Sequence, residues 1–417
     1  MRLFAYSKEE YMEAKALIEE AKGLQDELVS IRHELHQHPE LGFDLNFTKP
    51  FVKKKLEELG YSVEEVGKAG LVTTISGKTP GKTILIRADM DALPINEEAD
   101  VEFKSLTEGK MHACGHDMHA TMLLGAAKLL KEHQDEIIGT IKLEFQPAEE
   151  IFQGSEDMIK NGLLKNPDVD AAVMFHVVAG VPMPAGMIMV PGGGVTMASC
   201  EQYHITVTGK SGHGSMPHAS IDAITAAAQI HLALQEINSR EIAPDEYGVF
   251  TTCRFEAGNA SNVFPEKAQM WGTIRTLDPE GRIGEQIKTR MTEITKGIAS
   301  AMRCGAEIEF ADFCPSMVTD GALAQQALSI MQELYGPMTI DMAAINGGKP
   351  GGGSEDFAFV SHEVPTVGMY IVAGNSKEGY QYGQHNSKVR FDDTILNKGS
   401  AAYAYMALRW LQENGGN

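Results

Sequence analysis

The sequence predicts an α/β protein whose main domain has a parallel sheet and is interrupted by a smaller α+β domain. Between residues 71 and 176, short β-rich segments alternate with helical ones, an order typical of parallel strands joined by crossover helices. Between residues 202 and 310 the order changes to β-α-β-β-α-β, which is typical of a ferredoxin-like domain. The first pattern then resumes. We therefore expect a discontinuous main domain at 1–195 and 315–417, with an insert at 196–314.

Two helices are expected at the start of the chain. Ser7 and Glu10 have the spacing of a capping box, and apolar residues then recur at helical spacing from Tyr11 to Leu35. Pro39 ends this pattern, because proline lacks the amide hydrogen that a helix needs. A second helix is expected from Thr48 to Leu59.

The rest of the main domain is assigned from short β-rich runs and longer helical patterns. The expected strands are Leu71 to Ile75, Thr83 to Ala88, Thr140 to Phe145, Ala171 to Phe175 and Thr366 to Val372. The expected helices run to about His133, from Ser155 to Leu164, from Ala322 to Leu334 and from Ile395 to Gln412.

The insert follows a glycine-rich stretch, Pro191 to Gly194, which is interpreted as a hinge. Its expected strands are Gln202 to Thr208, Gly248 to Phe255, Ala268 to Thr276 and Ala306 to Phe310, and its helices are Ile221 to Asn238 and Gly284 to Met302.

Composition limits the partners of the protein. The chain carries 36 basic and 57 acidic residues, a formal net charge of −21, whereas nucleic acids and anionic membranes are bound through clustered Lys and Arg. Five scattered cysteines do not fit a disulfide framework and favour a reducing compartment. No apolar leader and no run of the ~18 apolar residues of a spanning helix is found, so we expect a cytoplasmic protein.

Chemically active side chains follow three successive strands. They are Asp89 with Asp91, Glu149 with Glu150, and His176. Open α/β sheets place their sites at the carboxyl ends of strands. Taken singly, the aspartates also suit a turn and the glutamates a solvated helix N-terminus. Because all three groups fall at consecutive strand ends, together they predict a site.

The stretch from Met111 to His119 supplies further candidates. Cys114 and His116 lie where a loop turns into a buried helix, and thiolate and imidazole suit Zn²⁺ and its neighbours in the first transition row. On this stretch alone, a buried thiol beside a surface histidine explains the pattern equally well. His385, in a polar loop, is by itself typical of a solvated histidine. Other histidines are interpreted as structural or surface residues: His33, His36, His38, His133 and His231.

Together these segments resemble the M20 family of metallopeptidases and amidohydrolases, in its branch of N-acyl-amino-acid, auxin-conjugate and hippurate hydrolases. The resemblance covers nearly the whole chain in family order. It rests on Arg32 to His36, Pro39 to Gly42, Arg87 to Pro94, His112 to Asp117, Gln146 to Glu150, Phe175 and His176, Gly209 to Gly214, Asn262 to Pro265, Gly353 to Phe357, and His385 and Asn386.

The resemblance implies a catalytic domain with two divalent metal ions, Zn²⁺ or Mn²⁺, with Co²⁺ and Ni²⁺ as alternatives. The implied ligands are Cys114, His116, Glu150, His176 and His385. Glu149 would be the general acid and base, and Asp91 would orient a ligating imidazole. Adjacent residues of an extended stretch point to opposite faces, so we expect Glu150 to face the metal and Glu149 the substrate.

The resemblance also implies that the insert is a lid through which the chain forms a homodimer. His213, in a glycine-flanked loop, would reach the active site of the partner subunit. Asn262 and Arg275 would bind the carboxylate of the substrate, and Gly353 would also contact the substrate, although a strand-face ion pair explains Arg275 nearly as well. The family continues its glutamate pair with a glycine-rich run, whereas Ile151 to Ser155 follows here, a departure that bears on substrate preference.

The implied function is hydrolysis of N-acyl amino acids to a carboxylic acid and a free amino acid. A dipeptidase or carboxypeptidase with the same two-metal site is the alternative. Peptide-cleaving branches carry His-x-Asp where this chain has Asp89-Met90-Asp91, which favours acyl conjugates. A third hypothesis, an inactive metal-binding dimeric module, predicts a missing acid–base residue, but Glu149 is present.

Overall fold

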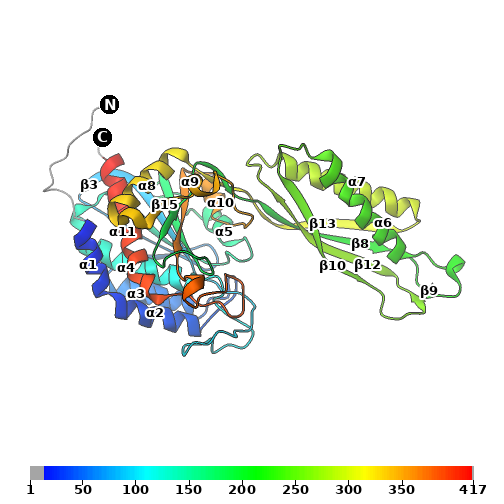
Figure 1. Ribbon diagram of the computed structural model, residues 1–417, viewed down its shortest axis with the longest axis horizontal. Helices are drawn as coiled ribbons and strands as arrows, with labels where there is room; N and C mark the ends of the chain where they lie inside the picture. The colour runs from blue at the N-terminus through cyan, green and yellow to red at the C-terminus, as the bar shows by residue number, and fades with distance from the viewer. Residues whose placement is uncertain (1–13, 416–417) are drawn as a thin grey trace. The chain divides into compact units, whose positions relative to one another are not determined.

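The computed structural model describes residues 14–415, which fall into two compact units (Figure 1). The first contains the described residues up to Gly194 together with Thr319–Lys349 and the described residues from Val360 on. The second contains Val195–Val318 and Pro350–Phe359. The capping box expected at Ser7 and Glu10 lies outside the described residues.

An eight-stranded sheet forms the centre of the first unit, in the order β1-β2-β4-β3-β5-β16-β6-β15. Its strands are β1 (Val63–Val66), β2 (Gly70–Ser76), β3 (Thr79–Asp89), β4 (Ile138–Gln146), β5 (Ala171–Val178), β6 (Ile188–Val190), β15 (Thr339–Asp341) and β16 (Thr366–Val372). The four central strands β4, β3, β5 and β16 are parallel, so the predicted α/β class is confirmed. Each of these central strands is buried over most of its length.

The edges of this sheet differ from the parallel arrangement expected from the sequence. β2 is antiparallel to β4, and β6 is antiparallel to β16. Only Gly77 and Lys78 separate β2 from β3, whereas a parallel connection needs a crossover of about a dozen residues or more. The chain therefore reverses after β2, and β4 lies between the two strands.

Helices cover this sheet. They are α1 (Ala14–Gly23), α2 (Gln25–Gln37), α3 (Thr48–Glu58), α4 (His116–Glu132), α5 (Gly154–Lys160), α8 (Gly321–Tyr335), α9 (Met342–Asn346), α10 (Ala358–Ser361) and α11 (Leu396–Asn414). Helices α4 and α11 lie side by side against β3 (Figure 1). Almost every residue of α4 is buried, so its N-terminal turn is held rigidly under the carboxyl ends of the central strands. No helix in the described ranges combines the length and apolarity that crossing a membrane requires.

The second unit has the predicted β-α-β-β-α-β order. Its strands β8 (Cys200–Thr208), β10 (Gly248–Ala257), β12 (Lys267–Thr276) and β13 (Gly305–Cys314) form an antiparallel sheet in the order β10-β12-β8-β13. Helices α6 (Ala223–Glu236) and α7 (Arg282–Ala301) pack on this sheet. The buried residues of α7 recur about every fourth position, from Ile283 to Ala299, which gives the helix one apolar face.

Two short ribbons complete the second unit and its connections. β9 (Gly212–His213) pairs with β11 (Val263–Phe264), and β7 (Gly194–Met197) pairs with β14 (Met317–Thr319). These two- to four-residue strands are too short to be recognised from sequence periodicity, and none of them was predicted.

Candidate functional site

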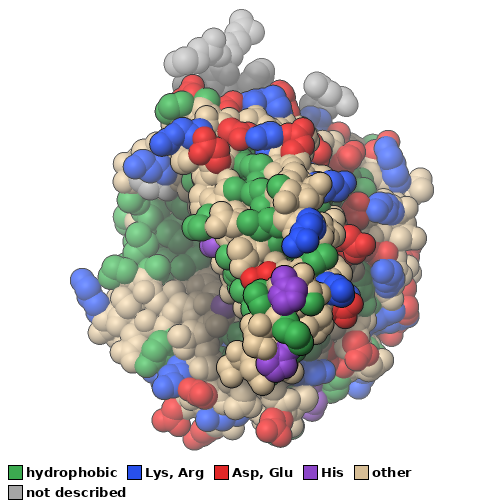
Figure 2. Space-filling model, turned by 90° about the vertical axis from the view of Figure 1, so that its right-hand side faces the viewer, with side chains coloured by type: hydrophobic (Ala, Val, Ile, Leu, Met, Phe, Trp, Pro, Cys, Tyr) green, Lys and Arg blue, Asp and Glu red, His purple; other side chains and the backbone are tan. Residues whose placement is uncertain are grey.

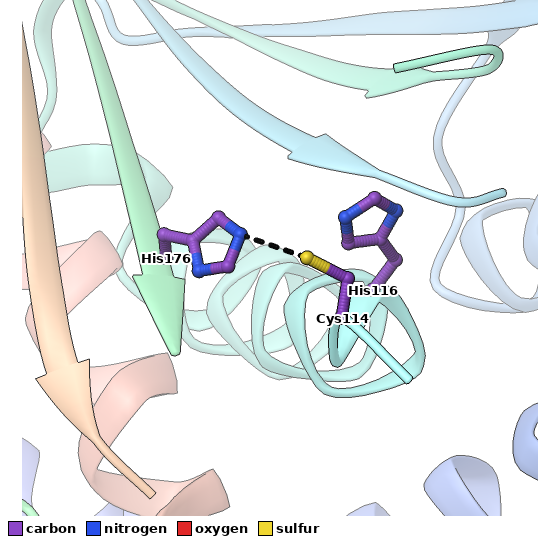
Figure 3. A group of neighbouring side chains, drawn as sticks. All are labelled: Cys114, His116 and His176. Atoms are coloured by element: carbon purple, nitrogen blue, oxygen red, sulfur yellow. Dashed lines mark hydrogen bonds between the residues drawn. The ribbon is translucent and has the colours of Figure 1, made fainter. Parts of the chain in front are cut away.

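Cys114 and His176 face each other at the carboxyl end of β5. The Cys114 sulfur lies 3.4 Å from Nε2 of His176, and His116 rises from the start of α4 on the same side (Figure 3). Nδ1 of His176 lies 2.6 Å from the Val177 carbonyl, to which it donates its proton, so Nε2 presents a lone pair to the thiol. Gly115 permits this approach, because its φ is +92° and an added Cβ would lie 2.4 Å from the Val177 side chain.

His116 is buried within a ring of carboxylates. Its Nε2 lies 3.5 Å from Asp89, 3.8 Å from Glu150 and 3.9 Å from Glu149. Its Nδ1 lies 3.4 Å from Asp91. Neither ring nitrogen has a hydrogen-bond partner of ordinary geometry, and neither does Oε1 of Glu150. Buried polar atoms of this kind normally bind something, and these separations leave room for a cation between the side chains.

In the described part of the chain, three groups made up only of the predicted ligands and Glu149 have donor atoms close enough to hold metal ions. They are Cys114 with His116 and His176, Cys114 with Glu150 and His385, and His116 with Glu149 and Glu150, each with its atoms within 4.8 Å of one another. All five predicted ligands therefore come together, and Cys114, His116 and Glu150 each belong to two of these groups. Thiol, imidazole and carboxylate donors at these distances fit two divalent ions.

His385 reaches this cluster from the loop before α11. Its backbone amide donates to the carbonyl of Ala113, and Gln384 donates to the carbonyl of Val177 at 2.6 Å. The His385 backbone has a φ of +62°, an uncommon value for a residue with a side chain. Its Nε2 lies 3.6 Å from Glu150. The loop is thus fastened to the segments that carry Cys114 and His176.

The glutamate pair is not extended, contrary to expectation. The chain turns at Ala148 and Phe152, whose φ values are +56° and +54°, and the Phe152 amide donates to the Glu149 carbonyl. Because of this turn, both carboxylates approach the same imidazole nitrogen of His116. The prediction that Glu149 and Glu150 point to opposite faces was wrong, since it assumed a straight backbone.

Asp91 holds this turn in place. One of its oxygens accepts a hydrogen bond from the Glu149 amide at 3.1 Å, and the other accepts from the Glu150 amide at 3.2 Å. Its carboxylate also lies 3.4 Å from Nδ1 of His116. Asp91 therefore orients both the imidazole and the backbone that carries the two glutamates.

Burial sets the protonation of the cluster. It raises the pKa of the Cys114 thiol well above its usual range and that of the Glu150 carboxyl to about 7. It lowers the pKa of His176 well below its usual range. Burial also disfavours the charged form of His116, but the carboxylates of Asp89 and Asp91 outweigh it and raise that pKa. Without a cation, burial thus favours the neutral thiol of Cys114, and a bound cation would displace its proton.

Sequence reasoning missed His119. Its Nδ1 donates to Asp89 at 2.5 Å, and its Nε2 accepts the Val177 amide proton at 2.8 Å. Arg87 fixes Asp89 from the other side at 2.8 Å. Although His119 lies close to His116 and Asp89, both of its nitrogens are engaged, so it positions neighbours and does not ligate. The three-residue spacing from His116 on one helix face was the signal that could have found it.

The remaining predicted residues lie in the second unit. His213 is exposed on β9, and the amide of the next residue, Gly214, donates to the carbonyl of Asn262 at 2.8 Å. Arg275, on β12, donates to the Ser354 hydroxyl at 2.9 Å and to the Gly352 carbonyl at 3.2 Å. These partners are uncharged, whereas the alternative interpretation of Arg275 needed a carboxylate.

These residues form two separate groups. His213 and Asn262 lie at the β9 end of the unit (Figure 1), next to the start of β12 at Lys267. Arg275 and the neighbouring Gly353 segment lie near the opposite end of β12. Arg275 lies eight positions after Lys267 on this strand, a span of about 26 Å. The two groups therefore lie toward opposite ends of β12.

Comparison with known proteins agrees with this geometry. The family described as peptidase family M20/M25/M40 matches residues 85–409. Thermostable carboxypeptidase 2 of Saccharolobus solfataricus is 36% identical over 396 residues, covering 94% of this chain and 97% of the relative. Hippurate hydrolase of Campylobacter jejuni is 36% identical over 397 residues, covering 95% and 100%. A solved Bacillus subtilis structure, described as a dinuclear metal-binding peptidase of the M20 family, is 32% identical, with a TM-score of 0.75 over 94% of this chain and 99% of that one.

Proposed function

The chain belongs to peptidase family M20/M25/M40, and from this premise we propose that it hydrolyses the amide bond of N-acyl amino acids, releasing a carboxylic acid and a free amino acid. The observation that carries the proposal is the convergence of Cys114, His116 and Glu150 with an adjacent acid, Glu149, at one edge of the sheet. The likeness to a hippurate hydrolase supports the substrate class, since hippurate is itself an N-acyl amino acid.

We propose that two divalent ions bind here, Zn²⁺ or Mn²⁺, with Co²⁺ and Ni²⁺ as alternatives. Two donor groups, Cys114 with His116 and His176 and Cys114 with Glu150 and His385, together contain all five proposed ligands and share Cys114, so the thiolate would be a ligand in either group. When bound, the ions would lower the pKa of the attacking water and polarise the scissile carbonyl.

The side chains supply the proton transfers. Glu149 would accept the proton of the attacking water and return it to the leaving nitrogen, as a general base and then a general acid. Asp91 accepts a hydrogen bond from the amide of Glu149, so the backbone that carries this carboxylate is held before substrate binds. Arg275 would bind the carboxylate of the substrate, because a planar guanidinium matches that group.

We further propose that the insert is a lid that forms a homodimer and that His213 of the partner subunit completes each site. The separation of His213 and Asn262 from Arg275 along β12 supports this arrangement. Edge strand β10 and helix α6 are the candidate contact surface. On α6, Leu232 is 64% exposed and Ile224 42%, and Figure 2 shows hydrophobic side chains reaching the surface among charged ones.

Subunit mixing tests the proposed dimer. Glu149→Gln and His213→Ala homodimers should each be inactive, whereas a mixed dimer would contain one site with both residues intact. We expect the mixture to recover a measurable fraction of the wild-type rate of amine release. Proven subunit exchange without any recovery would contradict the action of His213 across the interface.

A substrate panel tests the proposed activity against the peptidase alternative, which the likeness to a carboxypeptidase favours. We expect free amine from N-acetyl, N-benzoyl or N-indoleacetyl amino acids, and much less from the matching dipeptides. Arg275→Ala should raise KM for these substrates with a smaller change in kcat, and the loss should be absent for the corresponding amino acid amides. Faster cleavage of dipeptides than of every acyl amino acid would favour the peptidase.

A further inference from the structure

A buried network of charged side chains lies beside the candidate site, and the proposed mechanism does not use it. Nε of Arg32 and Nδ1 of His36, both on α2, lie 2.8 Å from the same oxygen of Asp117. Nε2 of His36 lies 3.1 Å from Glu97, and Arg32 also donates to Asp393 at 3.0 Å. Arg32, His36 and Asp117 are each at most 3% exposed.

The geometry indicates that His36 is an imidazolium. Each of its nitrogens faces a carboxylate, Asp117 on one side and Glu97 on the other, and carboxylates only accept hydrogen bonds. Burial and the nearby Arg32 guanidinium lower the pKa of His36, but these acids outweigh both and the pKa is raised. A buried ionic network of this kind adds little net stability compared with apolar packing, so its main effect is expected to be on the geometry that it fixes.

The network connects the segments that carry the proposed ligands. Asp117 directly follows His116 in the first turn of α4. Asp393 lies eight residues after His385, and the amide of Glu98, next to Glu97, donates to the Ser387 carbonyl at 2.7 Å. The amide of His385 in turn donates to the Ala113 carbonyl, beside Cys114. Through these contacts, helix α2 is bonded both to the segment that carries Cys114 and His116 and to the segment that follows His385.

We propose that Arg32 and His36 are positioning residues that hold these two segments in the metal-receiving arrangement before the ions bind. The inference rests on the proposed metal site. Without the network, the segments that carry the ligands would have to become ordered when the metal ions bind. Metal affinity would therefore fall. Groups hydrogen-bonded directly to a ligand typically change affinity by about 10–100-fold, and because Arg32 and His36 act one residue further out, through Asp117, we expect an effect at the lower end of that range, about 10-fold.

The test compares His36→Gln with His133→Gln. His133 also lies between two carboxylates, Glu20 and Glu136, but at the far end of α4, about 25 Å from His116 along the helix. The full chain, stripped of metal, is titrated with Zn²⁺ and with Mn²⁺ by competition with a chelating dye, at a temperature where all variants are folded. We expect His36→Gln to bind each metal about 10-fold more weakly and His133→Gln to bind like the wild type.

Equal metal affinity in His36→Gln and the wild type would overturn the proposal, and so would equal losses in both variants. If His36→Gln does not fold, Arg32→Lys replaces it, because lysine keeps the charge but cannot bridge Asp117 and Asp393 as the guanidinium does. Metal binding is measured without substrate. A chain that binds two ions but hydrolyses no acyl amino acid would therefore refute the proposed function and leave this inference standing.

Discussion

Glu149→Gln is expected to retain both metal ions and to lose turnover by a factor on the order of 10²–10⁴, the usual share of general acid–base catalysis. Glutamine keeps the size and polarity of the side chain but cannot accept a proton. The backbone should not move, because the amide of residue 149 still donates to Asp91. The measurement is kcat at saturating substrate and metal, together with metal content after dialysis.

Glu150→Gln is the matched control. Glu150 lies close to both Cys114 and His385, which are proposed ligands. Within the first unit, Glu149 belongs to only one group of possible donor atoms, the one that it forms with His116 and Glu150. A neutral amide is a poorer ligand than a carboxylate, so Glu150→Gln should lose or weaken one metal ion. If Glu149→Gln loses metal while Glu150→Gln keeps it, the two roles are reversed. Near-normal turnover of metal-loaded Glu149→Gln would refute the mechanism.

The sequence was sufficient to predict the position of the candidate site, because the ends of short apolar strands can be recognised in a sequence. Asp91, Glu149 and His176 each follow a short apolar run, and the parallel pairing of β3, β4 and β5 brings those ends to one edge. The ferredoxin-like order of the insert was equally readable, since its strands and helices are long and regular. The edge strands β1 and β15, and β6 next to β15, have only three or four residues each, carry no periodicity and were missed.

The local backbone conformation of the glutamate pair could not be predicted from the sequence. Ala148 and Phe152 adopt positive φ values, which residues with these side chains rarely adopt. The sequence therefore gave no sign of the turn that brings Glu149 and Glu150 to one imidazole. His36 was interpreted as structural or surface because its helix position gives no sign of partners 61 and 81 residues away. Contacts at such separations follow from the packing of α2 against α4, which exists only in the folded chain.

Cys114→Ala is expected to release both metal ions, because the Cys114 sulfur is the one donor that belongs to both groups containing the five proposed ligands. None of the five cysteines, all of which lie in the described residues, forms a disulfide, so the substitution breaks no covalent link. Removing a direct ligand should weaken metal binding by more than the roughly 10–100-fold that outer partners cost. Activity at limiting metal should fall with it.

Cys304→Ala provides the control for this prediction. Cys304 is a thiol of the second unit with the same 8% exposure as Cys114, so both substitutions leave a similar small cavity, but only one removes a proposed ligand. Metal content after dialysis and the dissociation constants for Zn²⁺ and Mn²⁺ are compared for both variants. Unchanged stoichiometry and affinity in Cys114→Ala would exclude the thiolate as a ligand. Loss of only one ion would instead place Cys114 on a single metal, with carboxylate and imidazole donors sufficient for the other.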